Sequence, residues 1–137
     1  MTRVKLDFDS IKLMSLFESL TGAGVRDCIL DDKVILIIEE NQMGRAIGKN
    51  GSNIRKFEEK LRKKVKLAEF SRDVVQFVKN LIYPIQPQDI QNIEGVITIN
   101  GKDTSTRAML IGRERKNINM VASIVKRYFD IKEIRVI

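Results

Sequence analysis

The sequence contains no histidine, no tryptophan, one cysteine and two prolines in 137 residues. Without histidine, imidazole metal sites and triads of the usual kind are excluded. The single thiol, Cys28, can form neither an internal disulfide nor a zinc site. We therefore expect a reducing, cytoplasmic setting and an ordinary strand residue at Cys28.

Long hydrophobic runs are also missing. The longest apolar runs, such as Val34–Ile38, have the length of a strand and are far too short to cross a membrane. Charged residues interrupt the N-terminus before a secretory signal could form. We therefore expect no membrane partner, although 43% apolar residues suffice for a buried core.

Carboxylates offer little for catalysis. The pairs Asp31–Asp32 and Glu58–Glu59 are interpreted as a hairpin turn and a solvated helix face. We therefore predict a protein that is not an enzyme, with no catalytic residues, no metal site and no cofactor.

Positive charge is concentrated in one segment. Residues 43–66 hold nine basic and two acidic residues, a difference that equals the formal net charge of +7. The basic residues are Arg45, Lys49, Arg55, Lys56, Lys60, Arg62, Lys63, Lys64 and Lys66. A basic segment on a neutral background favours a polyanionic partner.

Hydrophobic periodicity predicts an α+β fold. In the first half, a helix with Ser10 as its N-cap ends at Thr21–Gly22, and a hairpin of strands 25–30 and 33–39 follows. A helical pattern starts at Gln42, is interrupted at Gly48–Gly51 and resumes through Leu61, and a strand covers 65–70. The second half repeats this order, with helix 72–82, strands 88–93 and 95–100, helices 104–111 and 116–128, and strand 131–137.

A shift of 64 positions supports an internal duplication. It places Ile47-Gly48-Lys49 on Ile111-Gly112-Arg113, and Asn53-Ile54 on Asn117-Ile118. We therefore predict two domains, residues 1–71 and 72–137, each with helices packed against a three-stranded sheet as an α/β sandwich.

The most informative string is Ile47-Gly48-Lys49-Asn50-Gly51-Ser52-Asn53-Ile54. Two glycines around two polar residues allow a sharp turn and bring bare backbone close to a ligand. The helix that follows points its unpaired N–H groups at that ligand, which favours a phosphate, and Lys49 adds a cation. Ile47 and Ile54 could offer an aliphatic floor for bases.

Two other interpretations of these glycines remain open. The string Gly44–Lys49 faintly resembles a phosphate-binding loop of nucleotide triphosphatases, but its spacing is one residue short and Asn50 replaces the required Ser or Thr. Alternatively, Gly48 and Gly51 form only a tight turn between helices, which would leave the surrounding basic cluster unexplained.

The second copy departs from this pattern, because it contains Gly112-Arg113-Glu114-Arg115. Arginine at the second glycine position adds charge and is expected to lose access to unusual backbone angles, while Glu114 repels phosphate. Arg107, Arg113, Arg115 and Lys116 still make this loop basic. We hypothesise that the second copy grips its ligand in an altered way.

These features together resemble the KH module, whose Gly-x-x-Gly loop clamps single-stranded nucleic acid. The helix-first order is similar to type II KH domains, and two modules in tandem resemble the archaeal family of NusA-like transcription factors. By position, the resemblance implies an RNA site that comprises Arg45, Ile47, Gly48, Lys49, Asn50, Gly51, Ile54, Arg55, Gly112, Arg113, Arg115 and Lys116. It also implies that the strand at 65–70 forms the other wall of the groove.

The resemblance implies a factor of transcription elongation, termination or antitermination that binds nascent single-stranded RNA, with RNA polymerase as a candidate partner. We also expect the protein to be a monomer. Because the sequence contains few aromatic residues, we do not expect extensive base stacking. Two alternatives stay open: a KH protein of ribosome assembly or translation, and a protein-interaction adaptor whose KH folds no longer bind RNA.

Overall fold

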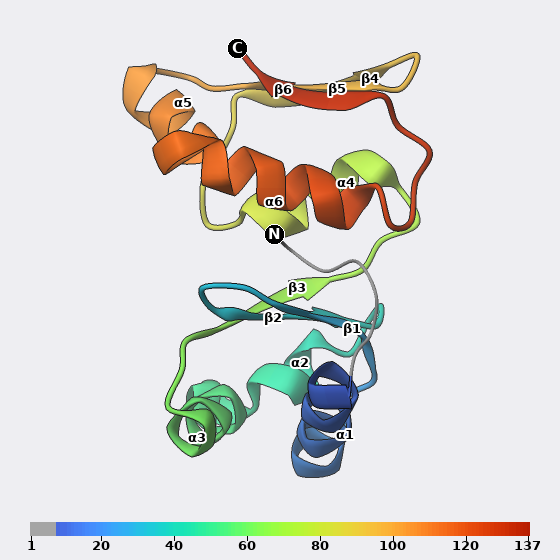
Figure 1. Ribbon diagram of the computed structural model, residues 1–137, viewed down its shortest axis with the longest axis vertical. Helices are drawn as coiled ribbons and strands as arrows, with labels where there is room; N and C mark the ends of the chain where they lie inside the picture. Colours follow the sequence, from blue (N-terminus) through green and yellow to red (C-terminus); the bar gives the residue numbers. More distant parts are fainter. Residues whose placement is uncertain (1–7) are drawn as a thin grey trace. The chain divides into compact units, whose positions relative to one another are not determined.

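The computed structural model describes residues 8–137, which divide into two compact units between Phe70 and Ser71 (Figure 1). Each unit contains helix, strand, strand, helix, helix and strand in that order. The division falls beside the predicted join at residues 71 and 72. The exact extent of the two domains stays a prediction.

The first unit has three helices on one face of a three-stranded sheet (Figure 1). Its elements are α1 (Phe8–Thr21), β1 (Val25–Leu30), β2 (Val34–Ile38), α2 (Met43–Ile47), the 3-10 turn η1 (Lys49–Gly51), α3 (Ser52–Leu61) and β3 (Val65–Glu69). Strand β2 lies in the centre, antiparallel to β1 and parallel to β3. All five residues of β2 are apolar and buried, as expected for a central strand.

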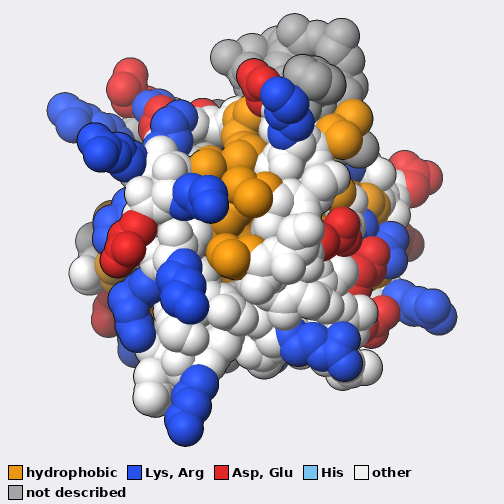
Figure 2. All heavy atoms as spheres, turned by 90° about the horizontal axis from the view of Figure 1, so that it is seen from below, with side chains coloured by type: hydrophobic (Ala, Val, Ile, Leu, Met, Phe, Trp, Pro, Cys, Tyr) orange, Lys and Arg blue, Asp and Glu red, His pale blue; other side chains and the backbone are white. Residues whose placement is uncertain are grey.

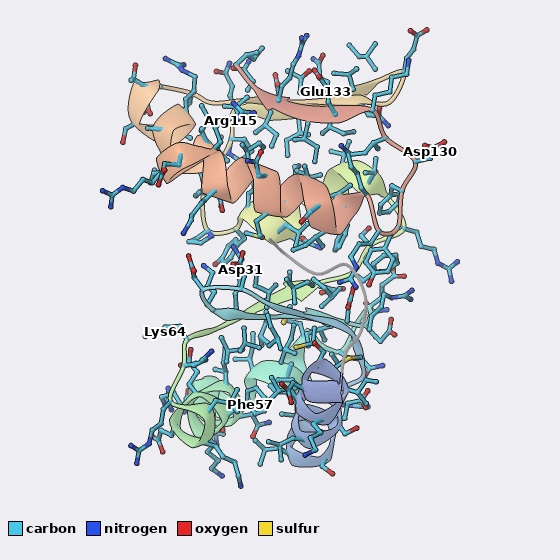
Figure 3. The ribbon with its side chains drawn as sticks, in the orientation of Figure 1. Asp31, Phe57, Lys64, Arg115, Asp130 and Glu133 are labelled. Carbon is cyan, nitrogen blue, oxygen red and sulfur yellow. The ribbon has the colours of Figure 1, made fainter. Side chains whose placement is uncertain are left out.

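Two aromatic rings hold the helices of this unit together. Phe17 of α1 and Phe57 of α3 are fully buried and meet edge to face with ring centroids 4.9 Å apart. Such a pair adds about 1 kcal/mol to the stabilisation from burial. In Figure 3, Phe57 extends from α3 toward α1. The packing fixes α3, and with it the loop that precedes α3.

The second unit repeats this architecture (Figure 1). Its elements are α4 (Val74–Ile82), β4 (Asp89–Ile93), β5 (Val96–Asn100), α5 (Thr104–Ile111), the 3-10 turn η2 (Arg113–Arg115), α6 (Lys116–Val125) and β6 (Glu133–Val136). Strand β5 lies between antiparallel β4 and parallel β6. Phe77 of α4 packs against the rings of Tyr128 and Phe129, at centroid distances of 6.1 and 5.9 Å.

The predicted order of elements and the α+β class are confirmed, with corrections at helix ends. Ser10 is not an N-cap, because the described helix already includes Phe8 and Ser10 is buried within it. Residues 10, 14 and 17 share one helical face, so Ser10 lies on the side of Phe17, whereas Ile11 is 50% exposed. Helix α4 starts at Val74 because Asp73 caps it, and α6 ends at Val125.

Among residues 8–137, no helix combines the length and the apolar character needed to span a membrane.

Candidate functional site

Gly48 forms the sharp corner between α2 and α3. Its backbone angles are φ 76° and ψ 173°, a region that essentially only glycine occupies. A Cβ atom at this position would lie 2.9 Å from the backbone nitrogen of Asn53. Both the angles and the close approach therefore require glycine at position 48.

Asn53 holds this corner in place. Its side-chain Nδ2 donates to the carbonyl oxygen of Arg45 at 2.8 Å, so the first turn of α3 is tied to α2. Within the corner, the amide of Gly51 donates to Gly48 O at 3.1 Å. The sequence prediction did not include Asn53 among the site residues. Its recurrence as Asn117 in the repeat was the signal that could have identified it.

The tip of the loop exposes its backbone. Asn50 and Gly51 both adopt left-handed angles, with φ 56° and φ 74°. The nearest neighbours of a Cβ atom at Gly51 would be side-chain atoms, with Nη1 of Arg55 at 3.1 Å and Cγ2 of Ile54 at 3.9 Å. Gly51 thus leaves the loop surface bare, and the guanidinium of Arg55 reaches back beside it. Lys49 and Asn50 are exposed at the tip.

Apolar side chains flank the loop on both sides. Ile47, the last residue of α2, is 39% exposed, and Ile54 in the first turn of α3 is half-buried. Helices α2 and α3 both lie near β3, which is an edge strand of its sheet. This places an aliphatic surface and an open strand edge beside the loop. Their contact with bases stays a prediction.

The positive charges of the basic cluster at residues 43–66 are largely not neutralised by nearby carboxylates. Within residues 8–137, eight of its nine basic residues form no ion pair: Arg45, Lys49, Arg55, Lys56, Lys60, Arg62, Lys63 and Lys64. Figure 2 views the α1 and α3 side of the first unit, and Lys and Arg side chains extend on its left, where α3 lies. Burial and the neighbouring Lys33 lower the pKa of Lys66 to about 8, so this side chain loses its charge at a lower pH than an ordinary lysine does.

The second loop has the same backbone shape as the first, and this corrects one expectation. Gly112 has φ 77° and ψ 168°, close to the angles of Gly48. Arg115 has φ 62° and ψ 20°, compared with φ 74° and ψ 18° at Gly51. Arginine at this position therefore keeps the left-handed angles that it was expected to lose. The αL region is open to residues other than glycine, at a modest cost.

The second loop makes contacts of the same kind, although its asparagine bonds one residue further along the preceding helix than Asn53 does. A Cβ atom at Gly112 would lie 2.8 Å from the nitrogen of Asn117, and Asn117 Nδ2 donates to Leu110 O at 2.9 Å. Arg113, Arg115 and Lys116 are exposed. In Figure 3, Arg115 lies at the start of α6. The side chain of Arg107 is engaged elsewhere. Its guanidinium donates to Gly101 O, which precedes α5, and to Oγ1 of Thr104, the first residue of α5.

The fold and the two glycine loops define a KH-domain protein. A family model described as KH domain matches residues 13–84, more than half of the chain. The solved crystal structure of APE1850 has the same fold, with a TM-score of 0.74 and 24% identity, over 96% of this chain and all of that one.

Relatives with curated names identify the family more closely. The chain is 36% identical over 140 residues to the probable transcription termination protein NusA of Methanococcus vannielii, covering 98% of this chain and 80% of the relative. It is 35% identical over 144 residues to the protein of the same name in Methanocaldococcus jannaschii, covering 100% and 77%. The chain belongs to the family of archaeal NusA-like proteins.

Proposed function

We propose that this protein binds single-stranded RNA and that the loop Gly48–Gly51 grips the RNA backbone. The observation that carries the proposal is a corner held by Asn53, with no side chain at Gly51 and with cations beside it that form no ion pair within residues 8–137. A phosphate can approach the loop because Gly51 itself carries no side chain, and Lys49 and Arg55 supply positive charge beside it. Arg45 adds charge from α2.

Bases of the bound RNA would then lie between the loop and β3. Ile47 and Ile54 provide the aliphatic surface, and the edge of β3 provides backbone groups. Base edges in this groove give sequence preference, whereas the lysines and arginines give affinity that depends on salt and not on sequence.

The biological role follows from the relatives, which are named as probable transcription termination proteins. We assign this chain to transcription elongation, termination or antitermination, with nascent RNA as its ligand. Within the same proposal, the protein acts in the cytoplasm as a monomer and contacts RNA polymerase, and it performs no catalysis.

Binding of a short single-stranded RNA, measured at several salt concentrations, tests the RNA site. The decisive variant is Gly51→Asp, which places a negative charge where the phosphate should lie and keeps an αL backbone that residues other than glycine can adopt. Gly22→Asp is its matched control, because Gly22 also has a positive φ of 75° and free space around it. We expect Gly51→Asp to lose most of the affinity and Gly22→Asp to bind like the wild type.

Absence of binding by the wild type at low salt would contradict the proposal, as would equal affinities of the two aspartate variants. The transcription role has its own test, which is affinity capture with the full chain as bait. Recovery of RNA polymerase supports it, and recovery of ribosomal subunits in its place would assign the protein to ribosome assembly or translation.

A further inference from the structure

The two loops differ in where a guanidinium is attached. In the first unit, Arg55 belongs to α3, and its Nη1 would lie 3.1 Å from a Cβ atom at Gly51. The shift of 64 residues that aligns the loops places Asn119 at the position of Arg55. The second unit therefore lacks this arginine on its helix, and it has Arg115 at the position of the glycine.

The backbone of the second loop accepts this exchange without a change of shape. Arg115 has the left-handed angles of Gly51, and its amide donates to Gly112 O at 3.1 Å, as the amide of Gly51 does to Gly48 O. No backbone atom lies near an added Cβ at Gly51, so the corresponding position has room for a side chain. Glycine is thus replaceable at this corner, unlike at Gly48 and Gly112.

The side chains at the second loop are available to a ligand. Arg113 and Arg115 are exposed, and neither forms an ion pair within residues 8–137. The only acidic residue of the loop is Glu114, which is exposed and occupies the position of Asn50. The loop therefore presents two arginines against one carboxylate, on a backbone of the same shape as the candidate RNA loop.

We propose that Arg115 binds a backbone phosphate of the RNA through its guanidinium, in place of the Gly51 and Arg55 pair of the first unit. This inference rests on the proposed RNA function and adds a second point of contact. A guanidinium matches the geometry of a phosphate and reaches further than bare backbone. A phosphate contact carries no base information, so the second loop strengthens binding equally for different RNA sequences.

Arg115→Gln tests this inference in the full chain, because it removes the guanidinium and leaves the backbone angles accessible. Arg135→Gln, on an exposed position of β6, is the matched control with the same loss of charge. Affinities for oligo(U) and oligo(A) of 12 nucleotides are measured over a series of salt concentrations. We expect Arg115→Gln to weaken both RNAs by a similar factor and to reduce the slope of log K against log salt by about 1.

A relocation variant tests whether an arginine on α6 can replace Arg115, as Arg55 on α3 stands beside Gly51 in the first unit. Arg115→Gly combined with Asn119→Arg recreates the arrangement of the first unit, and we expect it to recover most of the affinity that Arg115→Gly loses. Thermal unfolding of each variant verifies that the fold is retained.

Two outcomes would overturn this inference and leave the proposed function intact. In the first, the wild type binds RNA and Arg115→Gln weakens that binding no more than Arg135→Gln does. In the second, Arg115→Gly binds RNA more tightly than the wild type does. Failure of the wild type to bind RNA would overturn both this inference and the proposed function. A loss of affinity by Gly51→Asp, with Arg115→Gln unaffected, would leave the first loop as the RNA site and reject the second.

Discussion

At the scale of single residues, the two glycines of the first loop have different roles. Gly48 occupies angles that other residues avoid and touches the backbone of Asn53, whereas Gly51 occupies the αL region and keeps a surface open. Gly48 is therefore required for the fold of the corner, and Gly51 is required for access to it.

Gly48→Ala should destabilise the protein by about 1–3 kcal/mol, because the added methyl group meets Asn53 and the backbone must leave its native angles. Gly44→Ala in α2 is the matched control. An added Cβ at Gly44 has nothing within 4 Å, and alanine is favoured over glycine inside a helix by about 1 kcal/mol. Urea unfolding measures both changes. A Gly48→Ala variant as stable as the wild type would contradict the account of this corner.

Lys66 predicts a dependence of stability on alkaline pH. Its pKa is about 8 in the folded protein and 10.5 for an ordinary lysine, so between these values the unfolded chain binds more protons than the folded one. The free energy of unfolding should therefore rise as pH increases from about 8 to 10.5. Lys66→Met should lack this rise. If the difference in the free energy of unfolding between the wild type and Lys66→Met stayed constant over this pH range, Lys66 would not titrate as described.

At the scale of elements, helix ends show what local sequence can predict. Helix α5 was predicted at Thr104–Ile111 with its observed bounds, and Asp103 caps it by accepting from the amide of Thr106 at 2.7 Å. The start of α1 was predicted wrongly at Ser10. Serine is strongly preferred at N-caps, so the sequence favours that position, and only the burial of Ser10 within the helix of the folded chain corrects it.

Asp103→Ala should destabilise the second unit, because the first turn of α5 loses its acceptor. Asp103→Asn keeps an acceptor and is the control. The hydrogen bonds from Thr106 lower the pKa of Asp103 below its ordinary 3.8, so its contribution is complete above that value and is lost as pH falls through the folded pKa. Thermal unfolding between pH 2 and 7 should show a larger acid sensitivity in the wild type than in Asp103→Ala. Equal sensitivity would argue against the cap.

At the scale of the whole molecule, charge is distributed unevenly. The net charge of +7 is concentrated at residues 43–66, and Lys56 and Lys60 are exposed on α3 without ion pairs in the described structure. Lys79 and Lys126 are also exposed, but they belong to the remainder of the chain, which is neutral.

Replacing Lys56 and Lys60 with glutamine should weaken RNA binding and reduce the slope of log K against log salt by about 1–2, because fewer counterions are released. The pair Lys79→Gln and Lys126→Gln removes the same charge and should change the slope little. RNA titrations at several salt concentrations measure both. If the two pairs reduced the slope equally, net charge alone would explain binding and the position of the cluster would not matter.

Element order, hairpin positions and the basic cluster were predictable because each depends on residues close together in the chain. The repeat also revealed the second loop, since Gly112 and Asn117 recur 64 residues after Gly48 and Asn53. These features determine the family of the protein and the place of its candidate site.

The role of each loop residue was decided only by the tertiary structure. The sequence could not reveal that Asn53 ties α3 to the carbonyl of Arg45, because that hydrogen bond joins two helices across the corner. It also suggested that arginine at position 115 would lose the left-handed backbone. The folded chain retains it, because the contacts of Gly112 and Asn117 on either side fix the corner regardless of the side chain between them.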